Sequence, residues 1–338
     1  MNHQLSILDL ASIGVGESTP DSLNASVHMA QRAEEWGYQR IWYAEHHNMP
    51  TIASSATSVL IGQVAARTSK IILGAGGVML PNHSPLTIAE QFGTLESFHP
   101  GRIELGLGRA PGSDQKTFRA LRRDPRSSDH FPEDVLELQA YLGEETRIPG
   151  INATPGRGTH VPLYILGSSL FGAQLAAMLG LPYSFASHFA PDALEQAVAL
   201  YRREFRPSAQ LAAPWVIAGV NVIAADSTGK AMELFQEAKR RRVSALVGRG
   251  REFTDEEADM ILEAPAGAQV RAMATHTGVG TADEVAEYLR SFATLADADE
   301  LIVVSQAVRR DAWLRSLELL APLNEQGISR AQVSAHGV

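Results

Sequence analysis

Apolar residues in this chain follow two alternating patterns, one typical of strands and one typical of helices. Short apolar runs rich in strand-forming residues predict eight strands, and apolar positions spaced three or four apart predict the helices between them. The predicted strands are Leu5–Ile13, Arg40–His46, Lys70–Leu80, Arg102–Gly108, Pro162–Leu166, Tyr183–His188, Trp215–Ala224 and Glu300–Val304. The predicted helices are Asp21–Gly37, Ser54–Thr68, Ser84–Phe98, Pro132–Leu142, Phe171–Leu179, Asp192–Phe205, Thr228–Val243, Ala282–Ala296 and Ala312–Leu323.

Eight strands that alternate with helices predict an α/β protein with a closed (β/α)₈ barrel, the TIM barrel. No glycine-rich fingerprint follows the first strand, which counts against a dinucleotide-binding fold. Residues 1–338 are expected to form a single barrel domain, with insertions after strands 4 and 7. The first insertion contains Ala110–Phe131, which has the composition of a long loop. The second is the polar segment Gly248–Gly278, which we interpret as a mobile lid.

Composition and charge exclude several classes of protein. The 338 residues contain no cysteine, so disulfide scaffolds, thiolate metal sites and cysteine nucleophiles are ruled out. The formal net charge of −9 makes nucleic acid or an anionic membrane an unfavourable partner. The absence of a long apolar span and of a basic leader before Gln4 predicts a cytoplasmic protein without a membrane segment. The basic run Lys239–Arg242 is interpreted as a solvated helix face.

The second predicted strand ends in Glu45, His46 and His47. In a parallel barrel the chemistry lies at the carboxyl ends of the strands, and histidine is suited to proton transfer near neutral pH. These residues therefore form either a catalytic group, with Glu45 orienting a histidine, or a simple polar cap. A metal site is disfavoured because no third ligand is spaced nearby in the sequence.

Other strand ends carry small or cationic residues. Gly76 and Gly77 follow the third strand, where they permit close approach of a ligand or a cis non-proline peptide bond, or simply tight packing. Arg109 follows the fourth strand and offers a cation for a phosphate or carboxylate. Ser168 and Ser169 follow the fifth strand and form either an anion site at a helix start or an N-cap. His188, near the end of the sixth strand, faces the barrel mouth or packs in the core.

Together these motifs resemble the bacterial luciferase-like flavin monooxygenase family. The resemblance covers most of the chain, and four blocks in this order carry it: Trp42-Tyr43-Ala44-Glu45-His46-His47, Ala65-Ala66-Arg67-Thr68, Leu73 to Pro81, and His99 to Arg109. The sequence Ala110-Pro111-Gly112-Ser113-Asp114 is most similar to the single-subunit, alkanal monooxygenase alpha-chain-like branch.

The resemblance implies a (β/α)₈ barrel that uses reduced FMN, supplied by a separate flavin reductase, and O₂. It implies a catalytic role for His46, with Glu45 and His47 as orienting residues, and a cis peptide at Gly76–Gly77 behind the flavin. It also implies that Arg109, Ser168 and Ser169 hold the flavin phosphate. The expected protein is a homodimeric monooxygenase acting on a small organic substrate, with no metal. The alternatives are F420- or FMN-dependent hydride transfer and a non-catalytic flavin-binding subunit.

Overall fold

The computed structural model describes residues 4–110, 115–248 and 251–324. The strands are β1 (Gln4–Asp9), β2 (Arg40–Tyr43), β3 (Ile72–Met79), β4 (Ile103–Gly108), β5 (Leu163–Gly167), β6 (Tyr183–Phe185), β7 (Val216–Ala224), β8 (Thr277–Gly280) and β9 (Glu300–Ser305). The helices are α1 (Thr19–Glu35), α2 (Thr57–Ala65), α3 (Pro85–Phe98), α4 (Gln115–Ala120), α5 (Phe131–Leu142), α6 (Leu170–Leu179), α7 (Leu194–Glu204), α8 (Thr228–Leu246), α9 (Asp255–Glu263), α10 (Ala268–Met273), α11 (Ala282–Leu295) and α12 (Arg310–Leu320). The 3₁₀ turns are η1 (Leu80–Asn82), η2 (Pro125–His130), η3 (Pro265–Gly267) and η4 (Ala321–Asn324).

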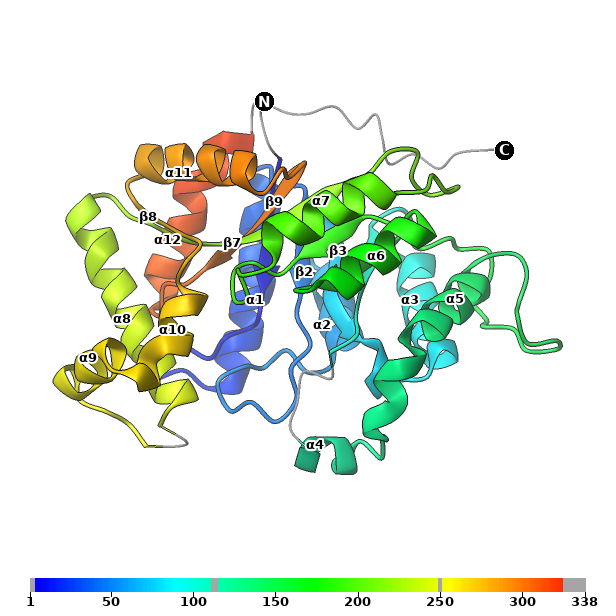
Figure 1. Ribbon diagram of the computed structural model, residues 1–338, viewed down its shortest axis with the longest axis horizontal. Helices are drawn as coiled ribbons and strands as arrows, with labels where there is room; N and C mark the ends of the chain where they lie inside the picture. The colour runs from blue at the N-terminus through cyan, green and yellow to red at the C-terminus, as the bar shows by residue number, and fades with distance from the viewer. Residues whose placement is uncertain (1–3, 111–114, 249–250, 325–338) are drawn as a thin grey trace.

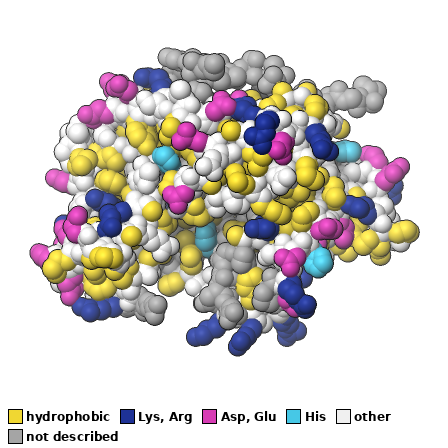
Figure 2. All heavy atoms as spheres, viewed as in Figure 1, with side chains coloured by type: hydrophobic (Ala, Val, Ile, Leu, Met, Phe, Trp, Pro, Cys, Tyr) yellow, Lys and Arg dark blue, Asp and Glu magenta, His cyan; other side chains and the backbone are white. Residues whose placement is uncertain are grey.

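Eight parallel strands close into a barrel, which confirms the predicted (β/α)₈ fold. β1 to β6 pair in sequence order, β6 pairs with β7, β7 with β9, and β9 with β1. Figure 1 shows helices around the outside of this barrel, with α4 at the lower centre and α9 and α10 at the lower left. Figure 2, in the same view, shows Lys and Arg side chains along the lower edge. Because α4 follows the carboxyl end of β4, this lower edge is the barrel mouth. None of the helices within the described ranges is both long enough and apolar enough to cross a bilayer.

A ninth strand, β8, was not predicted. It pairs with Asn221–Ala224 of β7, whereas the earlier part of β7, Val216–Ala218, pairs with β6. β6 therefore pairs with the first part of β7, and β8 pairs with its last part. Its four residues include two glycines, so the sequence has no strand-like apolar run there.

Both insertions contain more regular structure than the sequence indicated. The segment expected to be a loop after β4 includes α4 and η2, and the polar segment before β8 includes α9, η3 and α10. α4 and α10 have six residues each, too short to show a periodic apolar face. The proposed mobility of residues 248–278 stays a prediction.

The interpretation of Lys239–Arg242 as a solvated face was wrong for two of its residues. Arg240 forms ion pairs with Asp255 and Asp259 of α9, and the half-buried Arg242 donates to Gln306 just after β9. The cause is tertiary, because the carboxyl-terminal half of α8 packs against α9 and reaches the barrel mouth (Figure 1).

Alternate strand residues point into the barrel or out towards the helices, so the core has two layers. A large apolar cluster fills the space between strands and helices. A smaller cluster fills the barrel interior and consists of Leu8, Trp42, Ala44, Tyr164, Ile217, Ile302 and Val304.

The barrel interior also contains a buried ion network. The Arg40 guanidinium lies 3.6 Å from a carboxylate oxygen of Glu104 and 3.4 Å from one of Glu300. Trp42 Nε1 and Tyr164 Oη donate to Glu104 at 2.9 and 2.8 Å. Burial raises the pKa of Glu300 although Arg40 opposes the shift. The network joins β2, β4 and β9 across the barrel, so each strand has one defined inward face.

Replacing Arg40 with methionine tests the importance of this network. Arg40→Met leaves the carboxylates of Glu104 and Glu300 buried without a counter-charge, so we expect a loss of about 3–5 kcal/mol in the free energy of unfolding. Urea unfolding followed by far-UV circular dichroism measures the change. The matched control is the triple variant Arg40→Met, Glu104→Gln, Glu300→Gln, in which much of the loss should be recovered. A single variant as stable as the wild type would show that the network contributes nothing.

Candidate functional site

The residues Glu45, His46 and His47 lie at the barrel mouth, directly after β2. Arg40, Trp42 and Ala44 point into the barrel interior, and the same alternation sends His46 inward and its two neighbours to the other side. Backbone bonds hold this segment in place, because His46 N–H donates to Ser54 O at 2.9 Å and Ser55 Oγ donates to His46 O at 2.8 Å.

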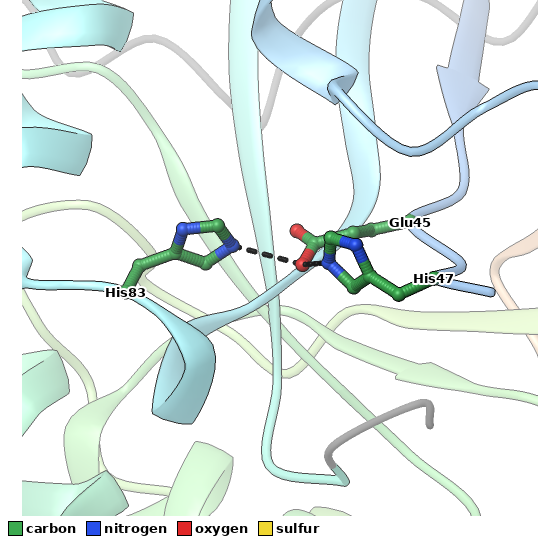
Figure 3. A group of neighbouring side chains, drawn as sticks. All are labelled: Glu45, His47 and His83. Atoms are coloured by element: carbon green, nitrogen blue, oxygen red, sulfur yellow. Dashed lines mark hydrogen bonds and ion pairs between the residues drawn. The ribbon is translucent and has the colours of Figure 1, made fainter. Parts of the chain in front are cut away.

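Glu45 is the centre of a hydrogen-bonded cluster that the sequence did not reveal (Figure 3). Its Oε1 accepts hydrogen bonds from Nε2 of His47 and Nε2 of His83, each at 2.8 Å, and its Oε2 accepts one from Met79 N–H at 3.1 Å. Burial alone would raise the pKa of Glu45, but the bonds from His47 and His83 outweigh it and the pKa is lowered. The bond to Glu45 raises the pKa of His47.

No third metal ligand is spaced near Glu45 and His47 in the sequence, but the fold brings one close to them. Glu45, His47 and His83 each offer one ligand atom, and these atoms lie within 4.8 Å of one another. His83 follows η1 and is brought to the cluster by the parallel pairing of β2 with β3. Because one carboxylate oxygen accepts both imidazole N–H groups, hydrogen bonds alone account for the arrangement.

His46 makes no hydrogen bond to this cluster among the described residues, and its charge acts on His188. Its Nδ1 is buried and has no hydrogen-bond partner in the described part of the chain. Burial lowers the pKa of His46, while the charge of Glu45 partly opposes the shift. The imidazole is therefore neutral at pH 7 and able to accept a proton. No hydrogen bond from Glu45 or His47 to His46 occurs among the described residues, so Glu45 influences His46 through its charge.

Each of the two predictions for His188, packing in the core and a position at the barrel mouth, describes part of its arrangement. Its ring is buried against Gly219 of β7, where a Cβ atom would lie 2.3 Å from His188 Nδ1. That nitrogen also has no hydrogen-bond partner among residues 4–110, 115–248 and 251–324. Burial, together with the charges of Arg242 and His46, lowers the pKa of His188 to about 3. The side chain is therefore packed and neutral, and it still lies beside His46 at the mouth.

The peptide bond between Gly76 and Gly77 is cis, as expected. Protein atoms fill the space beside both residues. A Cβ at Gly76 would lie 2.7 Å from Leu8 Cδ1 and 2.8 Å from Trp42 Cβ, and one at Gly77 would lie 2.8 Å from Gly106 O. Packing inside the barrel therefore accounts for glycine at both positions.

Arg109 is brought next to the turn that contains Ser168 and Ser169. Its Cζ lies 4.0 Å from the ring centroid of Phe171, in the first turn of α6. Ser169 is the N-cap of α6, but its side chain makes no capping bond, so the expected capping alternative is absent. Arg109 and Ser169 are exposed and Ser168 is half-buried. Pro111–Asp114, which follow this arginine, lie outside the described residues.

Residues 3–298 match the model of the luciferase-like monooxygenase family. The chain belongs to this family. It is 47% identical over 324 residues to a luciferase-like monooxygenase of Escherichia coli (strain K12), covering 95% of this chain and 97% of the relative. It is 45% identical to YvbT of Bacillus subtilis (strain 168) over 320 residues, covering 94% and 95% of the two chains.

Solved structures of luciferase-like monooxygenases and related barrels have the same fold. The crystal structure of apo-MsnO8 matches with a TM-score of 0.87 and 34% identity, over 96% of this chain and 98% of that one. More distant barrels, which show the fold alone, carry different cofactors. One is the oxygenating constituent of a 3,6-diketocamphane monooxygenase in complex with FMN, with a TM-score of 0.72, 17% identity and coverage of 95% and 97%. Another is an F420-dependent secondary alcohol dehydrogenase, with a TM-score of 0.70, 16% identity and coverage of 96% and 99%.

Glu45→Gln tests the cluster of Glu45, His47 and His83 in this luciferase-like monooxygenase. The amide cannot provide the charge-assisted bonds, so we expect a loss of about 1–3 kcal/mol in the free energy of unfolding. The lowered pKa of Glu45 means that the wild-type advantage is present above pH 4.5 and disappears as the pH falls through the folded-state pKa. The raised pKa of His47 means that its contribution is complete below pH 6.5 and declines as the pH rises through its folded-state pKa.

Chemical unfolding between pH 3 and 9 measures the difference between the two proteins, which should be largest between about pH 4.5 and 6.5. The matched control is Glu287→Gln on the exposed face of α11, which should change stability by less than about 0.5 kcal/mol. A deficit that does not vary with pH would contradict the assignment of charge to this cluster.

Proposed function

We propose that this luciferase-like monooxygenase uses reduced FMN and O₂ to oxidise a small organic substrate. Family membership supports the monooxygenase activity, and the FMN complex on the same fold supports the cofactor. The observation that carries the proposal is the Arg109 guanidinium beside the uncapped start of α6.

The residues at this turn fit a phosphate group. The first N–H groups of a helix have no partner within the helix and carry partial positive charge. The Ser169 side chain accepts no hydrogen bond from these N–H groups, because it does not cap α6. A fixed guanidinium beside them adds a full positive charge. Arg109, Ser168 and Ser169 would therefore hold the FMN phosphate, with Gly76 and Gly77 beside the flavin ring.

Reduced FMN supplies the electrons that activate O₂ when it is bound, and the protein binds, orients and manages protons. The neutral His46 imidazole accepts or donates a proton at the mouth, and its unpartnered Nδ1 is available for this purpose. Glu45 raises the basicity of His46 through its charge, and the bonds to His47 and His83 keep that carboxylate ionised.

Hydride transfer with F420 is the second candidate, since a barrel of this fold holds that cofactor. Oxygen uptake with photoreduced FMN distinguishes the two, because hydride transfer consumes no O₂. A non-catalytic flavin-binding subunit would bind FMN in the same assay without any substrate turnover.

The phosphate site is tested by Arg109→Ala. We expect the affinity for FMN to fall at least tenfold and the affinity for riboflavin to change little, because only FMN carries the phosphate. Fluorescence titration of both flavins measures the two affinities. Arg119→Ala on the exposed face of α4 is the matched control and should leave both unchanged. Equal weakening of FMN and riboflavin by Arg109→Ala would remove this residue from the phosphate site.

The catalytic role of His46 is tested by His46→Ala. Loss of a positioned general acid or base lowers turnover by about 10²–10⁴-fold, whereas FMN affinity should stay within about twofold of the wild type. Stopped-flow oxygen consumption and FMN titration measure the two quantities. His28→Ala on the outer surface of α1 serves as the control. Parallel losses in turnover and FMN affinity would make His46 a binding residue instead.

We also propose a cytoplasmic homodimer that receives reduced flavin from a separate reductase. Exposed apolar residues on neighbouring helices support the dimer, because Val59 of α2 is 71% exposed and Phe98 of α3 is 75% exposed. Ser58 Oγ donates to Gln91 Oε1 at 2.8 Å, so these two helices lie side by side. Sedimentation equilibrium measures the oligomeric state, and a monomer at micromolar concentration would refute the dimer.

A further inference from the structure

Arg242 is a half-buried cation whose charge has no carboxylate partner within the described residues. Its guanidinium donates one hydrogen bond through Nη2 to Gln306 Oε1, a neutral amide. No Asp or Glu of residues 4–110, 115–248 and 251–324 lies within ion-pair distance of it. Burial alone accounts for the lowered pKa of Arg242, with no opposing contribution from a carboxylate.

Three other arginines that pack into the described structure have carboxylate partners, whereas the half-buried Arg102 donates to the backbone carbonyl oxygens of Ala65, Thr68 and Ile71. Arg40 lies between Glu104 and Glu300, Arg240 between Asp255 and Asp259, and Arg310 against Glu17. A guanidinium withdrawn from water without a counter-charge costs stability, so such an arrangement normally requires an anionic partner.

A chain of amides fixes Arg242 at the mouth. Gln306, which receives the guanidinium hydrogen bond, donates from Nε2 to Asn221 Oδ1 at 2.7 Å. Asn221 Nδ2 in turn donates to the carbonyl oxygens of His188 and Met273, at 2.7 and 3.1 Å. The chain connects α8, β9 and β7 to the segment after β6. It holds the guanidinium without neutralising it.

The amide chain also brings the guanidinium near His188. Arg242 is close enough to His188 for its charge to disfavour protonation of that ring, and His188 has the same relation to His46. Nδ1 of both histidines has no partner in the described structure. A cation without a carboxylate partner and hydrogen-bonding atoms without partners are groups that suit a small anion.

We propose that Arg242 binds the anionic group of the organic substrate, a carboxylate or a sulfonate, beside His46. The assignment of this group to a substrate rests on the proposed monooxygenase function. An anionic terminus would give Arg242 its missing counter-charge and would place the rest of the molecule along the His46 and His188 rings. The Arg109 turn, on the other side of the mouth after β4 and β5, remains free for the flavin phosphate.

The test uses the flavin-free protein and three matched probes. Isothermal titration calorimetry measures the binding of butanoate, butane-1-sulfonate and the neutral butanamide. We expect saturable binding of at least one anion and no binding of butanamide. Arg242→Gln keeps an amide that can bond to Gln306 but loses the charge, so anion affinity should fall at least tenfold. Arg242→Lys, which keeps the charge, should retain part of the affinity.

Arg241→Gln is the matched control, since Arg241 is the adjacent arginine of the same helix and makes only a 3.5 Å contact with Ile13 O. It should bind the anion like the wild type. Melting temperatures and far-UV circular dichroism establish that each variant is folded. Equal anion affinity in Arg242→Gln and the wild type, an equal loss in Arg241→Gln, or an absence of anion binding by the wild type would overturn the proposal.

FMN and riboflavin titrations of the same variants separate this proposal from the proposed function. If Arg242→Gln abolishes the preference for FMN over riboflavin, the anion is the flavin phosphate and the substrate assignment is wrong. If the wild type binds the anion through Arg242 but binds no flavin, the proposed function fails and the anion site stands.

Discussion

Inside the closed barrel, the Arg40 guanidinium is shared by the carboxylates of Glu104 and Glu300. Buried charges are tolerated only when each has its partner, so this network defines the inward face of β2, β4 and β9. The alternation that directs Arg40, Trp42 and Ala44 inward then sends His46 inward and directs Glu45 and His47 to the other side. The position of the candidate proton-transfer residue therefore follows from the strand register that the buried ions define.

The hydrogen bonding of buried polar groups differs between the barrel interior and the barrel mouth. Around Arg40 the buried carboxylates have hydrogen-bond partners, and at the mouth the Glu45 carboxylate has three. Beside them His46 Nδ1 and His188 Nδ1 have no partner in the described chain, and Arg242 has only an amide. Stable proteins satisfy buried polar groups, and departures from this rule concentrate at functional sites. Arg40 Nε also lacks a partner in the described chain, so the mouth is favoured for a ligand because its unpaired groups lie at the carboxyl ends of the strands.

The glycine-rich strand ends illustrate how packing and function overlap. The large Trp42 ring fills the barrel interior next to Gly74 and Gly76, where Cβ atoms would lie 2.6 and 2.8 Å from its atoms. His188 similarly needs glycine at position 219. The sequence left ligand contact and tight packing open at Gly76 and Gly77, and the family resemblance implied the flavin. The Trp42 side chain beside Gly76 and the Gly106 carbonyl beside Gly77 already require this lack of side chains. A flavin contact at the same peptide is compatible with that packing.

Local sequence pattern determined the barrel, the strand-end position of His46 and the meeting of Arg109 with the Ser168–Ser169 turn, and the family resemblance implied the cis peptide at Gly76–Gly77. Parallel pairing brings consecutive strand ends together, so residues at adjacent ends are neighbours once the fold is known. Only the tertiary structure decided the place of β8, the contact of His83 with Glu45, and the burial of Arg242. A strand of four residues, such as β8, is too short to show a periodic pattern. A charged residue on a helix is expected to be solvated unless it is known what that helix packs against. Those contacts join segments far apart in the chain, and no local pattern records which of them will meet.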